Sequence, residues 1–600
     1  MCGITAYCGH DYALPFLMQG LAKLEYRGYD SAGVATLEKS GLFTLKCKGK
    51  LKNLEDLLQE HDVQGHVGIG HTRWATHGVP SQLNSHPHSN IDETISLVHN
   101  GIIENYHELK EELIQKGYQF QSETDSEVVV QLLDDEYDGN LFEALKRVLK
   151  KIKGSYALCV ISTYEPDKII VAKKDSPLII GKAKDAYVVA SDIPAILEYT
   201  KDVYFLDDYE MAVITSDSVD FYTHDGQDVS KQLTTVPYDL ESAKKDGYDT
   251  FMLKEIYEQP HVIKETLRGR IHDQNIVLDE LKDIDFHKFN KIYFVACGTA
   301  YHAGLCGSQV LQQSLKLPII TMVASEFRYC NPLIDDQTLA IFISQSGETA
   351  DTLAALRLAK SQNATTLAIA NVLGSTISRD ADYVLYTCAG PEIAVASTKA
   401  YTTQLVLLML LAYYIIQKLD ISFDSQILQQ LLALPDYIED ILKDHTPFQN
   451  YAKMIAPLHD VYFIGRGLDY ASVLEGALKL KEVSYIHADA YIAGELKHGP
   501  IALIEDGSVV IAVATQPHVA SKTISNIQET IARGAKVILF TTDKNNLKNI
   551  ENIYQLPIVS PILYTILVSV PLQLIAYYTA KYKGCDVDKP RNLAKSVTVE

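Results

Sequence analysis

The spacing of apolar and polar residues changes once along the chain. Up to about residue 220, short apolar runs of the β type are separated by turn residues, for example at 67–70, 95–99 and 156–161. Helical spacing interrupts these runs at 13–24 and 126–135. Runs of this kind, bounded by turn residues, predict an α+β domain with stacked sheets.

A different pattern begins after a polar, irregular stretch at about 225–250. Continuous apolar runs at 291–296, 339–343 and 365–370 alternate with tight turns and helical segments. This alternation predicts parallel sheets that are covered by helices on both faces.

The second pattern then repeats. Tyr293 and Tyr301 match Tyr462 and Tyr470 at a constant offset of 169. We therefore expect two copies of one α/β domain, joined by a helical segment around 403–450. The expected domains are 1–220, a linker at 221–250, 251–430, 431–590 and a tail at 591–600. The tail is too short to form a domain, so it either stays detached or completes a site.

Composition narrows the class of protein. The chain has 600 residues, a net charge of -22 and a pI near 5.3. An acidic protein is a poor partner for nucleic acid or an anionic membrane. Nine scattered cysteines without a CxxC pair indicate a reduced compartment. No basic segment precedes an apolar one at the N-terminus, so we expect no export signal and a cytoplasmic protein. The apolar stretches at 405–416 and 552–580 are interpreted as buried elements rather than membrane spans.

The first domain carries a candidate nucleophile. Cys2 follows the initiator methionine, so removal of Met1 would give one residue both a thiol and a free α-amine. A cysteine at this position can also have no function. Arg73 offers a planar fork for a carboxylate, and Asp125 could hold an α-amine. Asn100 and Gly101 offer an amide and an open backbone N–H, which are the parts of an oxyanion hole.

An alternative for this region is a zinc site. Its candidate ligands are histidines, namely His71, His77, His86, His88 and His99. Their spacing matches no strong ligand template, and polar loops often collect histidines.

The α/β copies carry a second group of candidates. Residues 344–349, Ser-Gln-Ser-Gly-Glu-Thr, lie between a strand and a helix, where free N–H groups and hydroxyls suit a phosphate. Helix capping without any ligand explains these residues equally well. No dinucleotide or nucleoside triphosphate motif is present. In the second copy, Glu475, Lys479 and Glu482 share one helix face, as surface salt bridges also do. His498 lies in a loop bounded by glycine and proline.

Together these motifs resemble the glutamine–fructose-6-phosphate aminotransferase (isomerizing) family over essentially the whole length. The segments at 2–4, 24–33, 71–78 and 99–105 are similar to its glutaminase domain. Those at 344–349, 395–400 and 494–500, with the closing tail, are similar to its tandem sugar isomerase (SIS) domains. The resemblance implies an N-terminal-nucleophile αββα domain of four layers, followed by two doubly wound parallel-sheet SIS domains.

The family converts L-glutamine and D-fructose 6-phosphate to glutamate and glucosamine 6-phosphate without metal or organic cofactor, as a homodimer. In the glutaminase half, the resemblance makes Cys2 the nucleophile and Trp74 the gate of an ammonia channel. It assigns the other matching residues to glutamine binding and the oxyanion: Arg73, Thr76, His77, Asp125, Asn100 and Gly101.

The resemblance also assigns residues in the SIS half. Glu482 would move a proton between C2 and C1, His498 would open the sugar ring from the neighbouring subunit, and Lys595 would form a Schiff base. Lys479 and Glu475 would support the proton transfer. The remaining matches line the sugar phosphate: Thr299, Ser344, Gln345, Ser346, Thr349, Val395 and Ser397. One departure is Ala300, where relatives often have serine, and we expect weaker sugar binding from it.

Two other functions remain open on the sequence. Tandem SIS domains also occur in regulators that bind sugar phosphates without catalysis, but a regulator would not need Cys2, Glu482 and Lys595 together. An amidotransferase acting on another phosphosugar is the second alternative, because the glutaminase half only makes ammonia.

Overall fold

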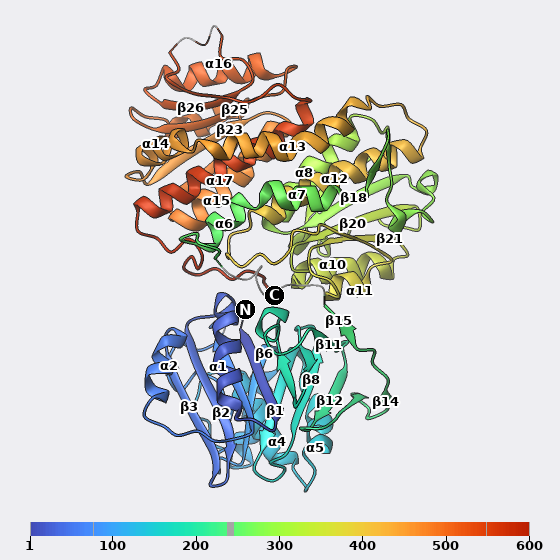
Figure 1. Cartoon of the computed structure of the whole chain (residues 1–600), viewed down its shortest axis with the longest axis vertical. Helices are drawn as coiled ribbons and strands as arrows, with labels where there is room; N and C mark the ends of the chain where they lie inside the picture. The colour runs from blue at the N-terminus through green and yellow to red at the C-terminus, as the bar shows by residue number, and fades with distance from the viewer. Residues whose placement is uncertain (1, 76, 237–244, 546, 548, 599–600) are drawn as a thin grey trace. The chain divides into compact units, whose positions relative to one another are not determined.

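The computed structural model describes residues 2–75, 77–236, 245–545, 547 and 549–598. The chain divides into two compact units, Met1–Ala243 with Ala594–Glu600, and Lys244–Leu593. Figure 1 labels many of the helices and strands and colours the chain by residue number. The division after Ala243 falls inside the stretch 221–250 that we expected to be a linker.

The described part of the first unit contains two antiparallel sheets, in the strand orders β15-β11-β9-β10-β1-β4-β2-β3 and β14-β13-β12-β8-β7-β6-β5. The strands of the first sheet are β1 (Gly3–Gly9), β2 (Ser31–Glu38), β3 (Gly41–Lys48), β4 (Val67–Arg73), β9 (Ile179–Lys182), β10 (Ala186–Ala190), β11 (Asp202–Phe205) and β15 (Thr234–Thr235). Those of the second are β5 (His88–Ser89), β6 (Ile95–Ile103), β7 (Gly154–Ser162), β8 (Ile169–Lys174), β12 (Glu210–Ile214), β13 (Val219–Thr223) and β14 (Asp228–Val229). Strands β13, β14 and β15 show that the chain continues in these sheets beyond residue 220.

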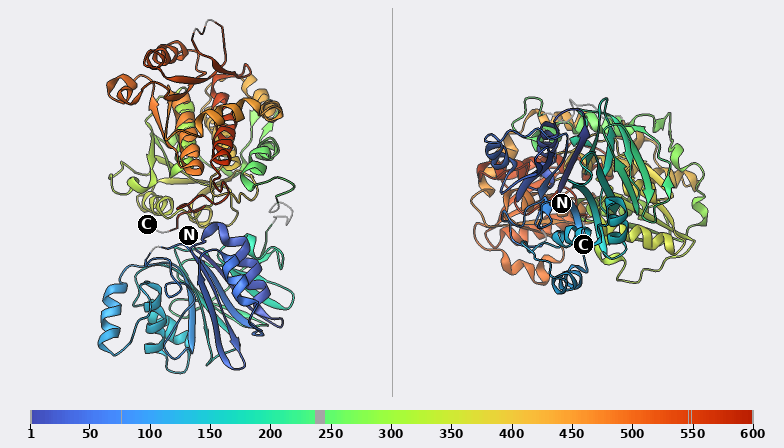
Figure 2. Two further views of the ribbon diagram at one scale, coloured as in Figure 1. Left: turned by 90° about the vertical axis from the view of Figure 1, so that its left-hand side faces the viewer. Right: turned by 90° about the horizontal axis from the view of Figure 1, so that it is seen from below.

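Apolar side chains form three core layers in this unit. Ile4 and Ile69 meet Val98 and Cys159 between the two sheets. Helices α1 (Ala13–Leu24) and α2 (Leu51–Leu58) cover the first sheet. Helices α3 (Tyr106–Gln115), α4 (Ser126–Glu136) and α5 (Leu141–Leu149) cover the second, so helices lie on both sides of the stacked strands (Figure 2). The expected αββα arrangement of four layers is confirmed.

The second unit contains two five-stranded parallel sheets with one topology, β19-β18-β20-β21-β22 and β24-β23-β25-β26-β27. The first consists of β18 (Lys291–Ala296), β19 (Ile319–Val323), β20 (Thr338–Ser344), β21 (Thr365–Ala370) and β22 (Tyr383–Tyr386). The second consists of β23 (Asp460–Gly465), β24 (His487–Ile492), β25 (Val509–Ala514), β26 (Lys536–Thr541) and β27 (Asn552–Gln555). A short hairpin, β16 (Ile271–His272) with β17 (Asn275–Ile276), precedes them. The expected repeat is confirmed.

Helices cover both faces of each parallel sheet. They are α6 (Phe251–Tyr257), α7 (Gln259–Leu267), α8 (Gly298–Gln312), α9 (Ala324–Phe327), α10 (Ala350–Ser361), α11 (Thr376–Asp380), α12 (Lys399–Lys418), α13 (Gln426–Lys443), α14 (Thr446–Ile455), α15 (Leu468–Ser484), α16 (Ala520–Ile531) and α17 (Tyr564–Tyr582). One core joins the two repeats through α8, α12, α15 and α17, while α9–α11 and α16 pack on the opposite faces. This is the doubly wound arrangement that the alternating pattern predicted.

Two helical segments of the described chain, Lys399–Lys418 and Pro561–Tyr582, are long and apolar enough to cross a membrane. Their most apolar windows are 89% and 94% buried inside the structure. Burial of this extent is what a core helix of a globular domain shows, and both helices contribute to the core that joins the repeats.

Candidate active sites

Cys2 directly precedes β1, the strand that pairs with β4 in the first sheet. This pairing sets Gly3 opposite Thr72, so the residues that follow β4 lie next to Cys2. The Trp74 N–H donates to Cys2 Sγ over 3.2 Å. From the second sheet, Asn100 Nδ2 donates to the Cys2 carbonyl oxygen over 3.0 Å. The predicted nucleophile, gate and oxyanion residues are thus brought together.

The Cys2 thiol is partly buried, and its desolvation raises its pKa. The hydrogen bond from Trp74 and the Arg73 guanidinium lower the pKa, but less than burial raises it. Because the thiolate is the reactive form, a thiol with a raised pKa needs a base beside it. Met1 lies outside the described residues, and its removal would expose the Cys2 α-amine as that base.

Arg73 and Asp125 border the loop that follows β4. Arg73 Nη2 donates to the carbonyl oxygens of His77 and Gly78, the latter over 3.1 Å. Its Nη1 is buried and has no hydrogen-bond partner within the described part of the chain. Asp125 Oδ2 accepts from the Ile103 N–H at 2.8 Å, and its Oδ1 lies 4.0 Å from His77 Nδ1. Thr76, the remaining predicted residue of this loop, lies outside the described residues.

A group of buried histidines packs next to Asn100. His71 Nε2 lies 3.1 Å from Asn100 Oδ1 and 3.1 Å from the His99 carbonyl oxygen. His71 stacks on His86, which meets His88 edge to face. Burial lowers the pKa of His71 to about 3, so the ring is neutral at neutral pH. Among the described residues, no three histidine, cysteine or acidic side chains are placed to share a metal ion.

The predicted phosphate turn follows β20. Ser344 Oγ lies 3.1 Å from Thr349 Oγ1 and accepts from the Gly347 N–H at 3.0 Å, and Ser346 Oγ accepts from the Glu348 N–H at 3.2 Å. Gly347 has φ +69, a conformation that suits glycine. The Gln345 carbonyl oxygen accepts from the Asn371 N–H of the neighbouring strand end at 3.1 Å. Hydroxyls therefore gather at the carboxyl end of the sheet, where α/β folds bind ligands.

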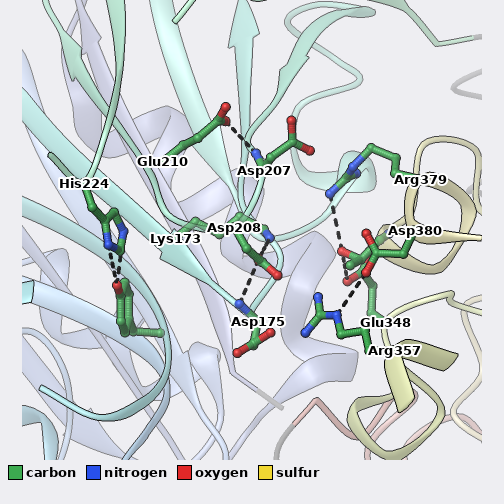
Figure 3. Close-up of polar contacts among 12 residues, drawn as sticks. Lys173, Asp175, Asp207, Asp208, Glu210, His224, Glu348, Arg357, Arg379 and Asp380 are labelled. Atoms are coloured by element: carbon green, nitrogen blue, oxygen red, sulfur yellow. Dashed lines mark hydrogen bonds and ion pairs between the residues drawn. The ribbon is translucent and has the colours of Figure 1, made fainter. Parts of the chain in front are cut away.

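Glu348 has a different role from its neighbours in this turn. Its carboxylate accepts from Thr376 N and Thr376 Oγ1, each at 2.8 Å, and so ties the turn to the start of α11. Next to it, Arg357 Nε donates to Asp380 Oδ2 over 3.0 Å (Figure 3). Figure 3 also shows a separate pair in the first unit, where Asp208 accepts from the Asp175 N–H at 2.8 Å. Both sets of contacts hold turns in place.

The three charged residues of α15 are mostly buried, rather than arranged as a solvated surface. Lys479 Nζ lies 2.6 Å from Glu482 Oε2 and 3.4 Å from Glu475 Oε1. The exposed fractions of these side chains are 1% for Lys479, 3% for Glu475 and 20% for Glu482. Burial alone would lower the pKa of Lys479, but the carboxylates of Glu482 and Glu475 raise it above its ordinary value. Lys479 therefore stays an ammonium at neutral pH.

This charged line reaches the first repeat through α8. Thr299 Oγ1 accepts from Lys479 Nζ at 3.1 Å and donates to Glu475 Oε1 over 3.0 Å. Thr299 follows β18, the strand beside β20. The α15 carboxylates thus meet the end of the first sheet that carries the hydroxyl turn. His302, which the sequence analysis did not select, lies on α8 like Thr299 and contacts Glu475. Its Nδ1 lies 2.8 Å from Glu475 Oε2.

The loop before α12 carries Val395 and Ser397. Glu392 and Asp588, which the sequence analysis missed, hold this loop in place. Glu392 accepts from Ser397 Oγ at 2.8 Å, and its other oxygen accepts from the Thr398 and Ala400 N–H groups at the start of α12. The Asp588 carbonyl oxygen accepts from the Val395 N–H at 3.0 Å. An acidic residue in the loop that leads into a helix start is the signal that could have identified Glu392.

Asp588 also fixes the beginning of the C-terminal tail. Its carboxylate accepts from the Phe251 and Met252 N–H groups at the start of α6, both at 2.9 Å. Three residues later, the Arg591 N–H donates to the Tyr485 hydroxyl over 2.8 Å, and the Arg591 guanidinium lies 4.2 Å from the centre of the Tyr485 ring. Tyr485 directly follows α15. The tail therefore starts from a fixed position beside the end of α15.

The two remaining predicted residues are His498 and Lys595. His498 is exposed, in a short 3-10 turn that ends at Gly499. Lys595 is partly buried in the tail segment that groups with the first unit. The roles that the resemblance gives them stay predictions.

Comparison with known proteins agrees with this architecture. A glutamine amidotransferase domain matches residues 71–198, and a SIS domain matches residues 285–414 and 454–581. Fold and sites thus define a glutamine amidotransferase unit joined to a tandem SIS unit.

Curated relatives match the whole chain, through both units. The glutamine–fructose-6-phosphate aminotransferase (isomerizing) of Clostridium tetani is 53% identical over 608 residues, and that of Aquifex aeolicus 45% over 602, each covering 100% of both chains. The chain belongs to the glutamine–fructose-6-phosphate aminotransferase (isomerizing) family. A solved C-terminal domain of the enzyme named glucosamine-fructose-6-phosphate aminotransferase, from Francisella tularensis, is 40% identical with a TM-score of 0.55 and covers 57% of this chain and 99% of that one.

Proposed function

We propose that this protein hydrolyses L-glutamine in its first unit and transfers the ammonia to D-fructose 6-phosphate in its second. Ketose-to-aldose isomerisation then gives glucosamine 6-phosphate, with glutamate as the other product. One observation carries this proposal: Lys479 joins Thr299 of the first repeat to Glu482 of the second. A carboxylate able to move a proton therefore lies at the sheet end that carries the hydroxyl turn.

In the glutaminase step, Cys2 Sγ attacks the carboxamide carbon of glutamine, and the Cys2 α-amine takes the thiol proton. Asn100 Nδ2 and the Gly101 N–H stabilise the oxyanion of the tetrahedral intermediate, because both donors are fixed before the charge develops. That proton leaves with the ammonia, and water then hydrolyses the thioester to glutamate. Arg73 would bind the glutamine carboxylate through its buried Nη1, and Asp125 the α-amine. Thr76 and His77 would complete the pocket, with Trp74 as the gate for ammonia.

In the sugar step, the hydroxyls of the turn would hold the phosphate, and His498 would open the ring. Lys595 would condense with the C2 carbonyl of the ketose, releasing water. Ammonia would then replace Lys595 at C2, which releases the enzyme amine and leaves a C2 imine that makes the C1 protons acidic. Glu482 would move one of these protons from C1 to C2, which gives the C1 aldehyde and the C2 amine. Glu475 and Lys479 would hold Glu482 in its charged, oriented form, while Val395 and Ser397 would line the sugar.

We also propose a cytoplasmic homodimer. His498 is exposed on its own chain, which is compatible with a role in the sugar site of a second copy. The mass of the protein in solution, measured by light scattering, tests this part. A monomer that retains full activity would contradict it.

The test of the function is incubation of the purified protein with glutamine and fructose 6-phosphate, with the products identified by mass spectrometry and NMR. Glucosamine 6-phosphate and glutamate are expected in equal amounts. Binding of fructose 6-phosphate without turnover would favour a sugar-phosphate regulator instead. Glutamate formation with amination of a different phosphosugar would favour another amidotransferase.

Two variants separate the half-reactions. Cys2→Ala should abolish synthesis from glutamine while leaving sugar isomerisation. Lys595→Ala should abolish amination and isomerisation while leaving glutamine hydrolysis. Loss of all activities in either variant, with the fold intact, would argue against two separable sites.

A further inference from the structure

His302 is the residue at the α15 charged line for which neither the motifs nor the comparisons suggest a role. It lies on α8 of the first repeat, and its side chain is 12% exposed. Its Nδ1 lies 2.8 Å from Glu475 Oε2. An ionised carboxylate can only accept hydrogen bonds, so His302 Nδ1 carries the hydrogen and donates it.

Glu475 is consequently held at both oxygens. Its Oε2 faces His302, while its Oε1 accepts from Thr299 Oγ1 at 3.0 Å and lies 3.4 Å from Lys479 Nζ. A carboxylate that is 97% buried needs such donors, because a buried charge without partners is unstable. His302 supplies the donor on the side that Lys479 does not reach.

The distances from Lys479 show what this arrangement achieves. One ammonium faces two carboxylates, and it lies closer to Glu482, at 2.6 Å, than to Glu475, at 3.4 Å. If Glu475 had no second donor, it would compete for the same ammonium. With Glu475 Oε2 bonded to His302, the ammonium remains directed at Glu482.

Two further titratable groups near Glu475 are neutral. Cys306 of α8 and Tyr401 of α12 lie within electrostatic range of Glu475. Burial raises the pKa of Cys306 to about 12 and that of Tyr401 well above its ordinary value, so neither bears a charge at neutral pH. Of the described side chains in contact with Glu475, only Lys479 and His302 can carry a positive charge.

We propose that His302 is a positioning residue of the sugar isomerase: its Nδ1–H holds Glu475, which leaves the Lys479 ammonium directed at Glu482. The proposal rests on the proposed function for the role of Glu482, and on the contacts alone for the bond between His302 and Glu475. It predicts an effect on the rate of proton transfer and not on sugar binding.

Three substitutions in the full-length protein test this role. Asparagine places its Nδ2 amide about where histidine has Nδ1, whereas the amide of glutamine reaches further, toward the Nε2 position. His302→Asn should therefore keep kcat for glucosamine 6-phosphate formation within threefold of the unsubstituted protein. His302→Gln and His302→Ala should lower it roughly tenfold to hundredfold, with KM for fructose 6-phosphate within twofold and glutamine hydrolysis unchanged. His287→Asn, at an exposed histidine of the same unit, is the control without effect.

Several outcomes would overturn the proposal. Equal losses in His302→Asn and His302→Ala would show that the imidazole ring itself is required. A raised KM at constant kcat would assign His302 to sugar binding, and unchanged kinetics in His302→Gln and His302→Ala would remove any role. The comparison of the asparagine and glutamine variants remains valid if His302→Ala does not fold.

A double-mutant cycle tests the contact independently of the reaction. His302→Ala and Glu475→Gln should change the unfolding equilibrium non-additively, by about tenfold, because each removes the same bond. His302→Gln replaces His302→Ala in the cycle if the alanine variant does not fold. Additive effects would overturn the contact. If the unsubstituted protein makes no glucosamine 6-phosphate, the proposed function fails, while the cycle still decides the bond between His302 and Glu475.

Discussion

The two SIS repeats share one sheet topology but carry different chemistry on equivalent helices. At the offset of 169, α15 has a glutamate, a lysine and a glutamate where the first repeat has a cysteine and a valine in α8 and a glutamine directly after it. The pairs are Glu475 with Cys306, Lys479 with Val310, and Glu482 with Gln313. The repeat that carries the charged line is thus not the one that carries the hydroxyl turn, and the contact of Thr299 with Lys479 joins the two.

The turns show the opposite difference. In the second repeat, the carboxylate of Asp469 accepts from the N–H groups of Thr515 and Gln516, at 2.9 and 3.3 Å, and from the Thr515 hydroxyl. Burial raises the pKa of Asp469, and these hydrogen bonds lower it only in part. The equivalent residue of the first repeat is Ala300, which has no group to fill the turn. One side chain in the first helical turn therefore occupies the donors of this turn in the second repeat, and alanine at the equivalent position of the first repeat does not.

The largest expected effect that tests this difference between the two repeats is at Glu482. Glu482→Gln should lower glucosamine 6-phosphate formation by about 10²–10⁴-fold, because an amide cannot accept the proton. Glutamine hydrolysis, measured as glutamate release, should persist. The matched control is Gln313→Glu at the end of α8, which should leave kcat unchanged. Retention of more than half of the activity in Glu482→Gln would contradict the assignment of the base.

The next effect concerns stability. Lys479→Met should lower the free energy of unfolding by about 3–5 kcal/mol, because two buried carboxylates lose their ammonium. Since the pKa of Lys479 is raised, this contribution is present below about pH 10.4 and is lost only as the pH rises further. Val310→Ala, at the equivalent apolar position, should cost about 2 kcal/mol through lost packing. Denaturant unfolding measures both, and equal losses would count against a special role for the ammonium.

A smaller effect would distinguish the turns. Thr349→Ala should raise KM for fructose 6-phosphate about tenfold to hundredfold, as expected for one lost hydrogen bond to a charged phosphate. Thr515→Ala should leave KM unchanged and lower the free energy of unfolding by about 1 kcal/mol. Steady-state kinetics and denaturant unfolding of both variants provide the measurement. A raised KM in Thr515→Ala would indicate that the second repeat binds the phosphate, contrary to the proposal.

The smallest effect is expected at Ala300. Ala300→Ser adds a hydroxyl beside the turn of the first repeat and should lower KM for fructose 6-phosphate by about fivefold, the value of one ordinary hydrogen bond. Titration of the sugar phosphate at fixed glutamine measures it. An unchanged KM would mean that this position does not face the phosphate, and the proposed cost of alanine there would be wrong.

Much of the fold follows from local patterns. The apolar run at 291–296 is β18 and the helical spacing at 13–24 is α1, because each is a property of neighbouring residues. The repeat offset predicted the second sheet. Strands β13–β15 were not foreseen, since β14 and β15 have only two residues each and β13 lies at the expected domain boundary.

The site was less predictable, for a physical reason. Glu475, Lys479 and Glu482 could be placed on one helix face, but spacing alone does not distinguish a buried line from a surface one. His302 and Glu475 lie 173 residues apart in sequence, and Val395 and Asp588 lie further apart still. Contacts of this kind arise from the packing of α8 on α15 and from the return of the chain end, and no local pattern encodes them.

The docking of Arg591 on Tyr485 has a further consequence for the amine of Lys595. Lys595 is four positions after Arg591, so an extended chain spans at most about 14 Å. One amine confined to a sphere of that radius has an effective concentration on the order of 0.1 M. A protein lacking Lys595 would need a free amine at about that concentration to replace it. In the proposed mechanism, the anchor at Tyr485 would thus make imine formation an intramolecular step.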